Sequence, residues 1–100
     1  MKKLVIALFS TLLAGFIPTM AAAQGDAAAG QAKSALCASC HGPDGNSPLA
    51  MNPKIAGQNA SYLVKQLQDF KSGARPGQTM AAMVLSLSDQ DMEDIAAWYA

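Results

Sequence analysis

The chain has 100 residues, of which 51% are hydrophobic and 14% are charged, and its seven basic and seven acidic side chains leave no net charge. No run of Lys or Arg breaks this balance, so the sequence gives no electrostatic basis for binding nucleic acid. The length fits one small domain.

The first 23 residues have the pattern of a secretory signal peptide. Two lysines follow the initial methionine, residues 4–17 form an apolar run, and residues 21–23 supply an A-x-A cleavage site. The run is shorter than the ~20 residues that a membrane-spanning helix needs, which disfavours the alternative of an uncleaved anchor. We therefore expect cleavage after Ala23, export to the periplasm, and a mature domain of residues 24–100 with five basic and seven acidic side chains.

The mature chain begins with an alanine-rich segment, and this composition predicts one helix over residues 26–39. The segment runs into Cys37, Cys40 and His41, which are spaced as C-x-x-C-H, the pattern of c-type haem attachment. Each thiol can form a thioether to one vinyl group, and the adjacent imidazole can ligate the iron. These are the only cysteines and the only histidine in the chain, so the motif uses all of them.

Three other interpretations of the motif explain less. A thioredoxin-like redox pair needs a βαβ unit, whereas no segment of this chain alternates like a strand. A structural zinc site needs four protein ligands, and one histidine and two cysteines supply three. A disulfide between the two cysteines would close only a very short loop and stabilise little.

The middle of the chain is predicted to be a long loop followed by a helix. Residues 42–57 are rich in Gly and Pro, which indicates an extended segment that wraps a cofactor. Asn59 is placed to cap a second helix over residues 60–72, and Gly73 is placed to end it. Residues 74–87 are expected to form a loop or short helical turns.

The residue pattern near the end of the chain predicts a third main helix. The expected fold class is therefore all-α. Ser88 is its expected N-cap, with Asp91 at the matching capping-box position. Leu87 and Met92 occupy the positions of a hydrophobic staple on either side of that cap.

Taken together, these motifs resemble a class I cytochrome c, and more narrowly a cytochrome c4 or c-553 domain. The resemblance implies the small class I cytochrome c fold, with three main helices wrapped around one covalently attached haem. It also implies a haem held by His and Met that shuttles single electrons, and no enzymatic activity. The match covers essentially the whole mature chain and is carried by residues 25–30, 37–41, 44–48, 53–58, 62–67 and 87–91.

Four methionines of the mature chain are candidates for the second iron ligand. Met51 is too close along the chain to the histidine side of the haem, and Met92 falls in the apolar stripe of the last helix, where core packing is its simpler role. The residues alone leave Met80 and Met83 open. In c4-like sequences the ligand stands seven residues before the Leu of the Leu-Ser-Asp motif, here Leu87, so the resemblance implies Met80.

The resemblance implies two further pairs of residues. The Pro53 carbonyl is expected to accept a hydrogen bond from the His41 ring, within a Pro-x-Leu-x-Gly segment in which Ile55 replaces the leucine. Gly30 and Trp98 are expected to meet where the first and last helices cross.

The expected function is that of a periplasmic one-electron carrier between respiratory redox proteins, a role consistent with association with membrane-bound oxidase or reductase complexes. One alternative is a haem domain of a larger assembly, either the first half of a dihaem c4 or the electron-entry subunit of a dehydrogenase or oxidase. The helical pattern continues to Ala100, so completeness of the chain stays open. A haem peroxidase-type enzyme is a weaker alternative, because it requires Met80 to leave the iron.

Overall fold

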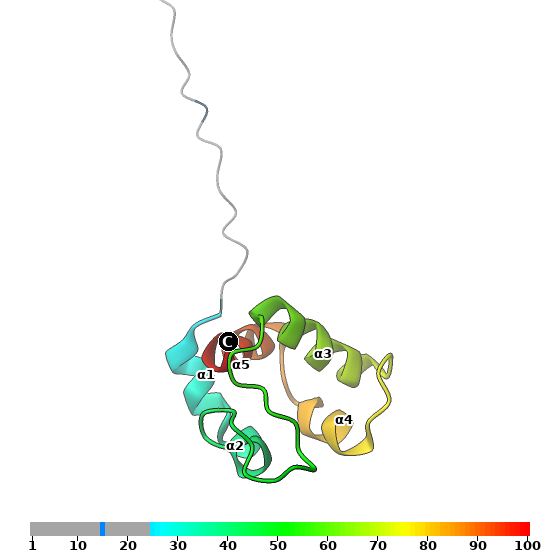
Figure 1. Cartoon of the computed structure of the whole chain (residues 1–100). Coiled ribbons are helices and arrows are strands. Elements are labelled where there is room, and N and C mark those ends of the chain that lie inside the picture. The colour runs from blue at the N-terminus through cyan, green and yellow to red at the C-terminus, as the bar shows by residue number, and fades with distance from the viewer. Residues whose placement is uncertain (1–14, 16–24) are drawn as a thin grey trace, which may run out of the picture.

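The computed structural model describes Gly15 and residues 25–100, and this part of the chain is all-helical (Figure 1). The predicted signal peptide, apart from Gly15, lies outside the described residues. Within the described part no helix is long and apolar enough to span a membrane. The helices are α1 (Ala27–Lys33), α2 (Ala35–His41), α3 (Ala60–Ser72), α4 (Gln78–Val84) and α5 (Asp89–Tyr99).

The first predicted helix is in fact two helices, α1 and α2, which meet at Ser34. The Ser34 hydroxyl donates to the Gln31 carbonyl at 2.9 Å, and its backbone N–H is 3.3 Å from the same oxygen. Such a local bond competes with regular helical pairing, so the chain turns here although its composition favours helix. The prediction of one continuous helix was wrong. The turn lets α2 carry the C-x-x-C-H motif to its last residue, His41.

The predicted ends of the later helices are confirmed. Asn59 caps α3 with a 3.3 Å bond from the Tyr62 N–H, and Gly73 ends α3 in the left-handed region at φ 85°. Ser88 and Asp91 form a reciprocal capping box at the start of α5, with bonds of 3.1 and 2.9 Å. The segment between α3 and α5 contains the short helix α4.

The helices α1 and α5 cross at Gly30, where their backbones come into contact. A Cβ atom on Gly30 would overlap the carbonyl oxygen and carbon of Asp94 and would lie 3.0 Å from the nitrogen of Ile95. The predicted crossing of the first and last helices is therefore present. The atoms nearest this position are backbone atoms of Asp94 and Ile95, within one turn before Trp98, so contact between Gly30 and Trp98 itself stays a prediction. The indole N–H of Trp98 donates to the Pro43 carbonyl at 3.2 Å.

A group of charged side chains also ties α1 to α5. Asp94, which is 4% exposed, accepts from the Asp26 N–H at 2.8 Å and from the Lys33 ammonium at 2.6 Å. The same ammonium lies 2.8 Å from an Asp91 oxygen. The side-chain bonds to Lys33 are the main reason that the pKa values of both Asp91 and Asp94 are lowered to about 2.

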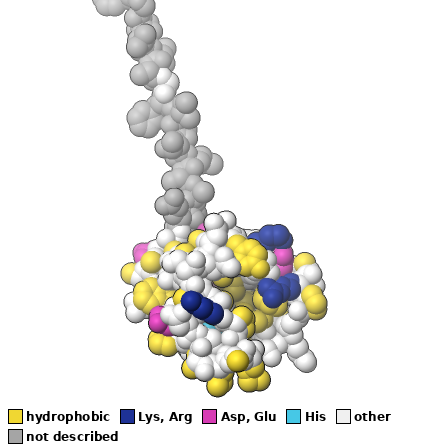
Figure 2. Space-filling model, viewed as in Figure 1, with side chains coloured by type: hydrophobic (Ala, Val, Ile, Leu, Met, Phe, Trp, Pro, Cys, Tyr) yellow, Lys and Arg dark blue, Asp and Glu magenta, His cyan; other side chains and the backbone are white. Residues whose placement is uncertain are grey.

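The remaining elements surround a recess rather than a closed core. Helix α3 packs on α5 and α4, and the loop of residues 42–57 runs across the opening between the helices (Figure 1). On the face shown in Figure 2, hydrophobic side chains gather in a recess and basic side chains stand beside it. The buried core between α3 and α5 is small and consists of Leu63, Val64, Ile95, Ala96 and Tyr99.

Candidate haem-binding site

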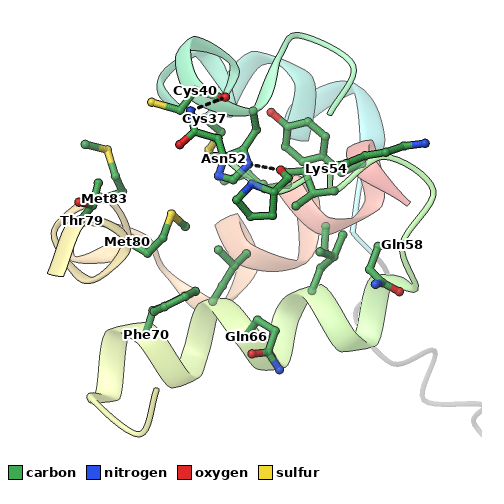
Figure 3. A pocket seen from close by; sticks show the side chains of 18 of the residues that line it. Cys37, Cys40, Asn52, Lys54, Gln58, Gln66, Phe70, Thr79, Met80 and Met83 are labelled. Carbon is green, nitrogen blue, oxygen red and sulfur yellow. Dashed lines mark hydrogen bonds between the residues drawn. The ribbon is translucent and has the colours of Figure 1, made fainter. Parts of the chain in front are cut away.

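A cavity of about 560 Å³ lies between α2, the loop of residues 42–57, α3 and α4. This volume is in the range of small-molecule and cofactor sites, which are mostly apolar with a few placed polar groups. Figure 3 shows the cysteines at one end of the cavity and Phe70 and Gln66 of α3 at the opposite end. The α4 methionines lie on one side, across from the loop that carries Asn52 and Lys54.

The two cysteines come from one turn of α2, and both thiols are free. Cys37 is partly buried and Cys40 is exposed, and both line the cavity. Burial is the main reason that the pKa of the Cys37 thiol is raised, and the neighbouring Cys40 adds to this. The helical spacing therefore presents two thiols at one end of the cavity.

His41 is buried at 8% exposure, and its ring is held by the loop of residues 42–57. The Nδ1 atom lies 2.8 Å from the Pro53 carbonyl oxygen. A carbonyl can only accept, so Nδ1 carries a proton and donates, and in a neutral ring Nε2 is the nitrogen with the free lone pair. The expected contact between His41 and Pro53 is present. It leaves a nitrogen ligand available at the cavity.

A second contact fixes this loop against the motif. The Asn52 amide donates to the Cys40 carbonyl at 3.1 Å, so the residue before Pro53 is bonded to the residue before His41. Two adjacent loop residues thus bind two adjacent residues of α2. The orientation of the imidazole is determined by both bonds rather than by the histidine alone.

The four methionines of the described residues differ in exposure and direction. Met51 is 84% exposed on the loop, whereas Met92 is completely buried in the packing of α5 and does not line the cavity. Met80 and Met83 both line the cavity from α4. Figure 3 shows the Met80 side chain directed into the cavity, while Met83 lies toward its outer edge and is 45% exposed.

Arg75, Phe70 and Gln66 also line the cavity, although sequence reasoning did not single them out. The Arg75 guanidinium lies over the Phe70 ring at 4.5 Å and donates to the Gln66 side chain at 2.7 Å. The sequence signal that could have placed Arg75 near these two residues is Gly73. A left-handed residue at the end of α3 turns the chain back over the last turn of the helix.

The donor set fits a haem. The cavity is largely apolar, an imidazole with a free nitrogen lies at one wall, a thioether points in from the other, and two thiols stand at one end. The charged side chains that line it, Lys54 and Arg75, are both cationic, which suits a ligand that carries carboxylates.

Comparisons with known proteins agree with this geometry. The family model described as cytochrome c matches residues 27–99. The chain is 52% identical to cytochrome c4 of Pseudomonas aeruginosa over its full length, which covers 48% of that protein. It is 42% identical to cytochrome c-554(548) of Halomonas halodenitrificans, over 76% of this chain and 95% of that protein.

Solved structures give the same result. The crystal structure of reduced recombinant cytochrome c4 from Pseudomonas stutzeri matches 75% of this chain and 44% of that chain, with a TM-score of 0.68 and 54% sequence identity. The chain spans about half the length of the curated cytochromes c4 that it matches.

Proposed function

The chain belongs to the cytochrome c family, and from this premise we propose that its folded domain is a one-electron carrier. It contains Cys37, Cys40 and His41 in the spacing that implies one covalently attached haem c. The observation that carries the proposal is the cavity bounded by His41 on the loop side and by Met80 on the α4 side.

The cysteines hold the cofactor in place. Each thiol would hold the haem through one thioether to a vinyl group, an addition that needs no oxidant and releases no leaving group. The bound haem supplies reversible ferrous–ferric chemistry.

In this proposal His41 and Met80 would hold the haem iron. Nδ1 of His41 donates to the Pro53 carbonyl, which would leave Nε2 to ligate the iron. Met80 supplies a neutral sulfur, which raises the reduction potential in His/Met cytochromes. Because two side chains would hold the iron, the arrangement favours electron transfer over a peroxidase-type reaction.

The test is to compare Met80→Ala with its matched control Met83→Ala, since both residues lie on α4 and line the cavity. Met80→Ala should abolish the ferric Met–sulfur charge-transfer band, lower the potential and allow external ligands to bind the iron. Met83→Ala should keep the band. The reverse pattern would assign the ligand to Met83, one helical turn further along.

We further propose export to the periplasm with cleavage after Ala23, and transient contact with donor and acceptor redox proteins. Several large apolar side chains stand exposed at the rim of the cavity, including Leu36, Met51 and Met83, and they offer a surface for such contacts. Intact mass of the protein isolated from periplasm tests the first point, since it reports the N-terminal residue and the number of haems together. An N-terminus other than Gln24 would contradict the proposed cleavage.

A further inference from the structure

Arg75 is fixed at the end of the cavity that lies opposite the cysteines. Its guanidinium stacks on Phe70 and donates to Gln66, and Figure 3 places these two α3 residues across the cavity from the attachment site. Its backbone N–H also donates to the Asp69 carbonyl at 3.1 Å. Both the main chain and the side chain of Arg75 are therefore held in place, although the residue is at the surface.

The charge around the cavity is one-sided. Among the residues that line it, Lys54 and Arg75 are the charged ones, and no carboxylate is present, although residues 24–100 contain more acids than bases. The other titratable groups there are His41, two tyrosines and the two cysteines that attachment consumes.

Lys54 is directed away from the cavity in Figure 3, and its charge contributes to the lowered pKa of Asp44. The ion pairs of the described part involve Lys33 and Lys65. Arg75 has no carboxylate partner within that part, so its charge is available to the cavity.

The chemistry of haem indicates what this charge meets. Haem carries its two vinyl groups toward one edge and its two propionates toward the other. Since the vinyl groups react with Cys37 and Cys40, the propionates are directed toward the opposite end of the cavity. A carboxylate leaving water for an apolar cavity needs a charged, hydrogen-bonding partner, and the planar guanidinium fork matches a carboxylate better than an ammonium does.

We propose that Arg75 binds a haem propionate, and that Phe70 and Gln66 orient its guanidinium for this contact. The inference rests on the proposed function in one respect, namely that haem occupies this cavity. Phe70 covers one face of the guanidinium and Gln66 takes one of its N–H groups, so the remaining N–H groups are the ones that meet the propionate.

This contact has a measurable consequence for the reduction potential. A fixed cation near the iron disfavours the ferric state, which carries one more positive charge, and therefore raises the potential. It also keeps the propionate ionised. Without the guanidinium the propionate takes up a proton more readily, and it does so more readily still in the ferrous state. The reduction potential of a variant without this guanidinium should therefore be lower than that of the parent at neutral pH, and it should rise as the pH falls.

The experiment is a redox titration of holoprotein from about pH 5 to about pH 8, comparing the parent, Arg75→Gln and Lys65→Gln. Lys65→Gln is the matched control, because it removes one positive charge from α3 outside the cavity, at an exposed pair with Asp69. Arg75→Gln should lower the potential at pH 7 and steepen its pH dependence while keeping the Met–sulfur band. Lys65→Gln should resemble the parent, and Arg75→Lys should recover part of the shift.

Two results would overturn the assignment. One is an Arg75→Gln potential and pH profile that match those of Lys65→Gln. The other is loss of the Met–sulfur band in Arg75→Gln, since Arg75 would then act by positioning α4. If Arg75→Gln gives no holoprotein, nuclear Overhauser contacts decide the matter in the parent: contacts between propionate and Arg75 protons support the proposal, and their absence refutes it. The Met–sulfur band of the parent tests the proposed function separately.

Discussion

The contact between α1 and α5 leads to a sharp prediction for the smallest possible substitution, Gly30→Ala. In an exposed helix interior this change stabilises a protein by roughly 0.5–1 kcal/mol, because glycine loses more conformational freedom on folding. Here we expect the opposite sign. The new Cβ would overlap the carbonyl group of Asp94, which is backbone in the middle of α5 and cannot rotate away as a side chain can.

The expected magnitude follows from the kind of atom that is displaced. Overpacking a well-filled contact costs about 1–3 kcal/mol, and a backbone obstacle favours the upper part of this range. For a domain of 60–100 residues each 1 kcal/mol lowers the unfolding temperature by roughly 4–8 °C, so a decrease of roughly 10–20 °C is expected. Covalent haem should be retained, since Gly30 lies outside the attachment motif.

The assay is denaturant and thermal unfolding of the holoprotein, followed by far-ultraviolet circular dichroism. Gln31→Ala is the matched control, because the next residue of the same helix is exposed and should change the unfolding free energy by less than about 0.5 kcal/mol. An unfolding midpoint of Gly30→Ala at or above that of the parent would refute the reasoning. It would mean that α1 and α5 are further apart than the structure places them.

Three other predictions concern attachment, acid stability and the core. Replacing Cys37 and Cys40 together by Ala should remove covalent haem, and haem staining of the denatured variant would contradict this. The pKa of Asp94 is lowered to about 2, so its contribution to stability is fully present above its ordinary pKa near 3.8 and is lost as the pH falls from about 4 to about 2. Thermal unfolding of Asp94→Asn should therefore depend less on pH in that window than unfolding of the parent, and parallel curves would count against the ion pair. Met92→Ala should cost about 2–5 kcal/mol of unfolding free energy in a denaturant titration but leave the Met–sulfur band unchanged, and loss of the band would make Met92 a ligand.

The helix ends show why part of this fold could be predicted. Asn59 and Ser88 cap their helices by bonds to N–H groups three residues away, and the glycine after α3 adopts its left-handed conformation locally. Such signals depend on neighbours in the chain, so composition and spacing suffice. The same local reasoning failed at Ser34, where a hydroxyl bond to the preceding turn outweighed the helical tendency of the surrounding alanines.

The sequence by itself determined what is carried by residues close together: the C-x-x-C-H motif on one helical turn, the capping box, and the loop rich in Gly and Pro. Only the tertiary structure decided which groups face one another. It directs the Met80 side chain into the cavity with Met83 toward the outer edge, brings Arg75 back over Phe70, and joins Lys33 to Asp94 across 61 positions of sequence. The physical reason is the separation along the chain of the residues that interact. A cap or a motif is satisfied within one turn of helix, whereas contacts between distant residues exist only after the helices have packed, and the sequence alone does not encode their distances.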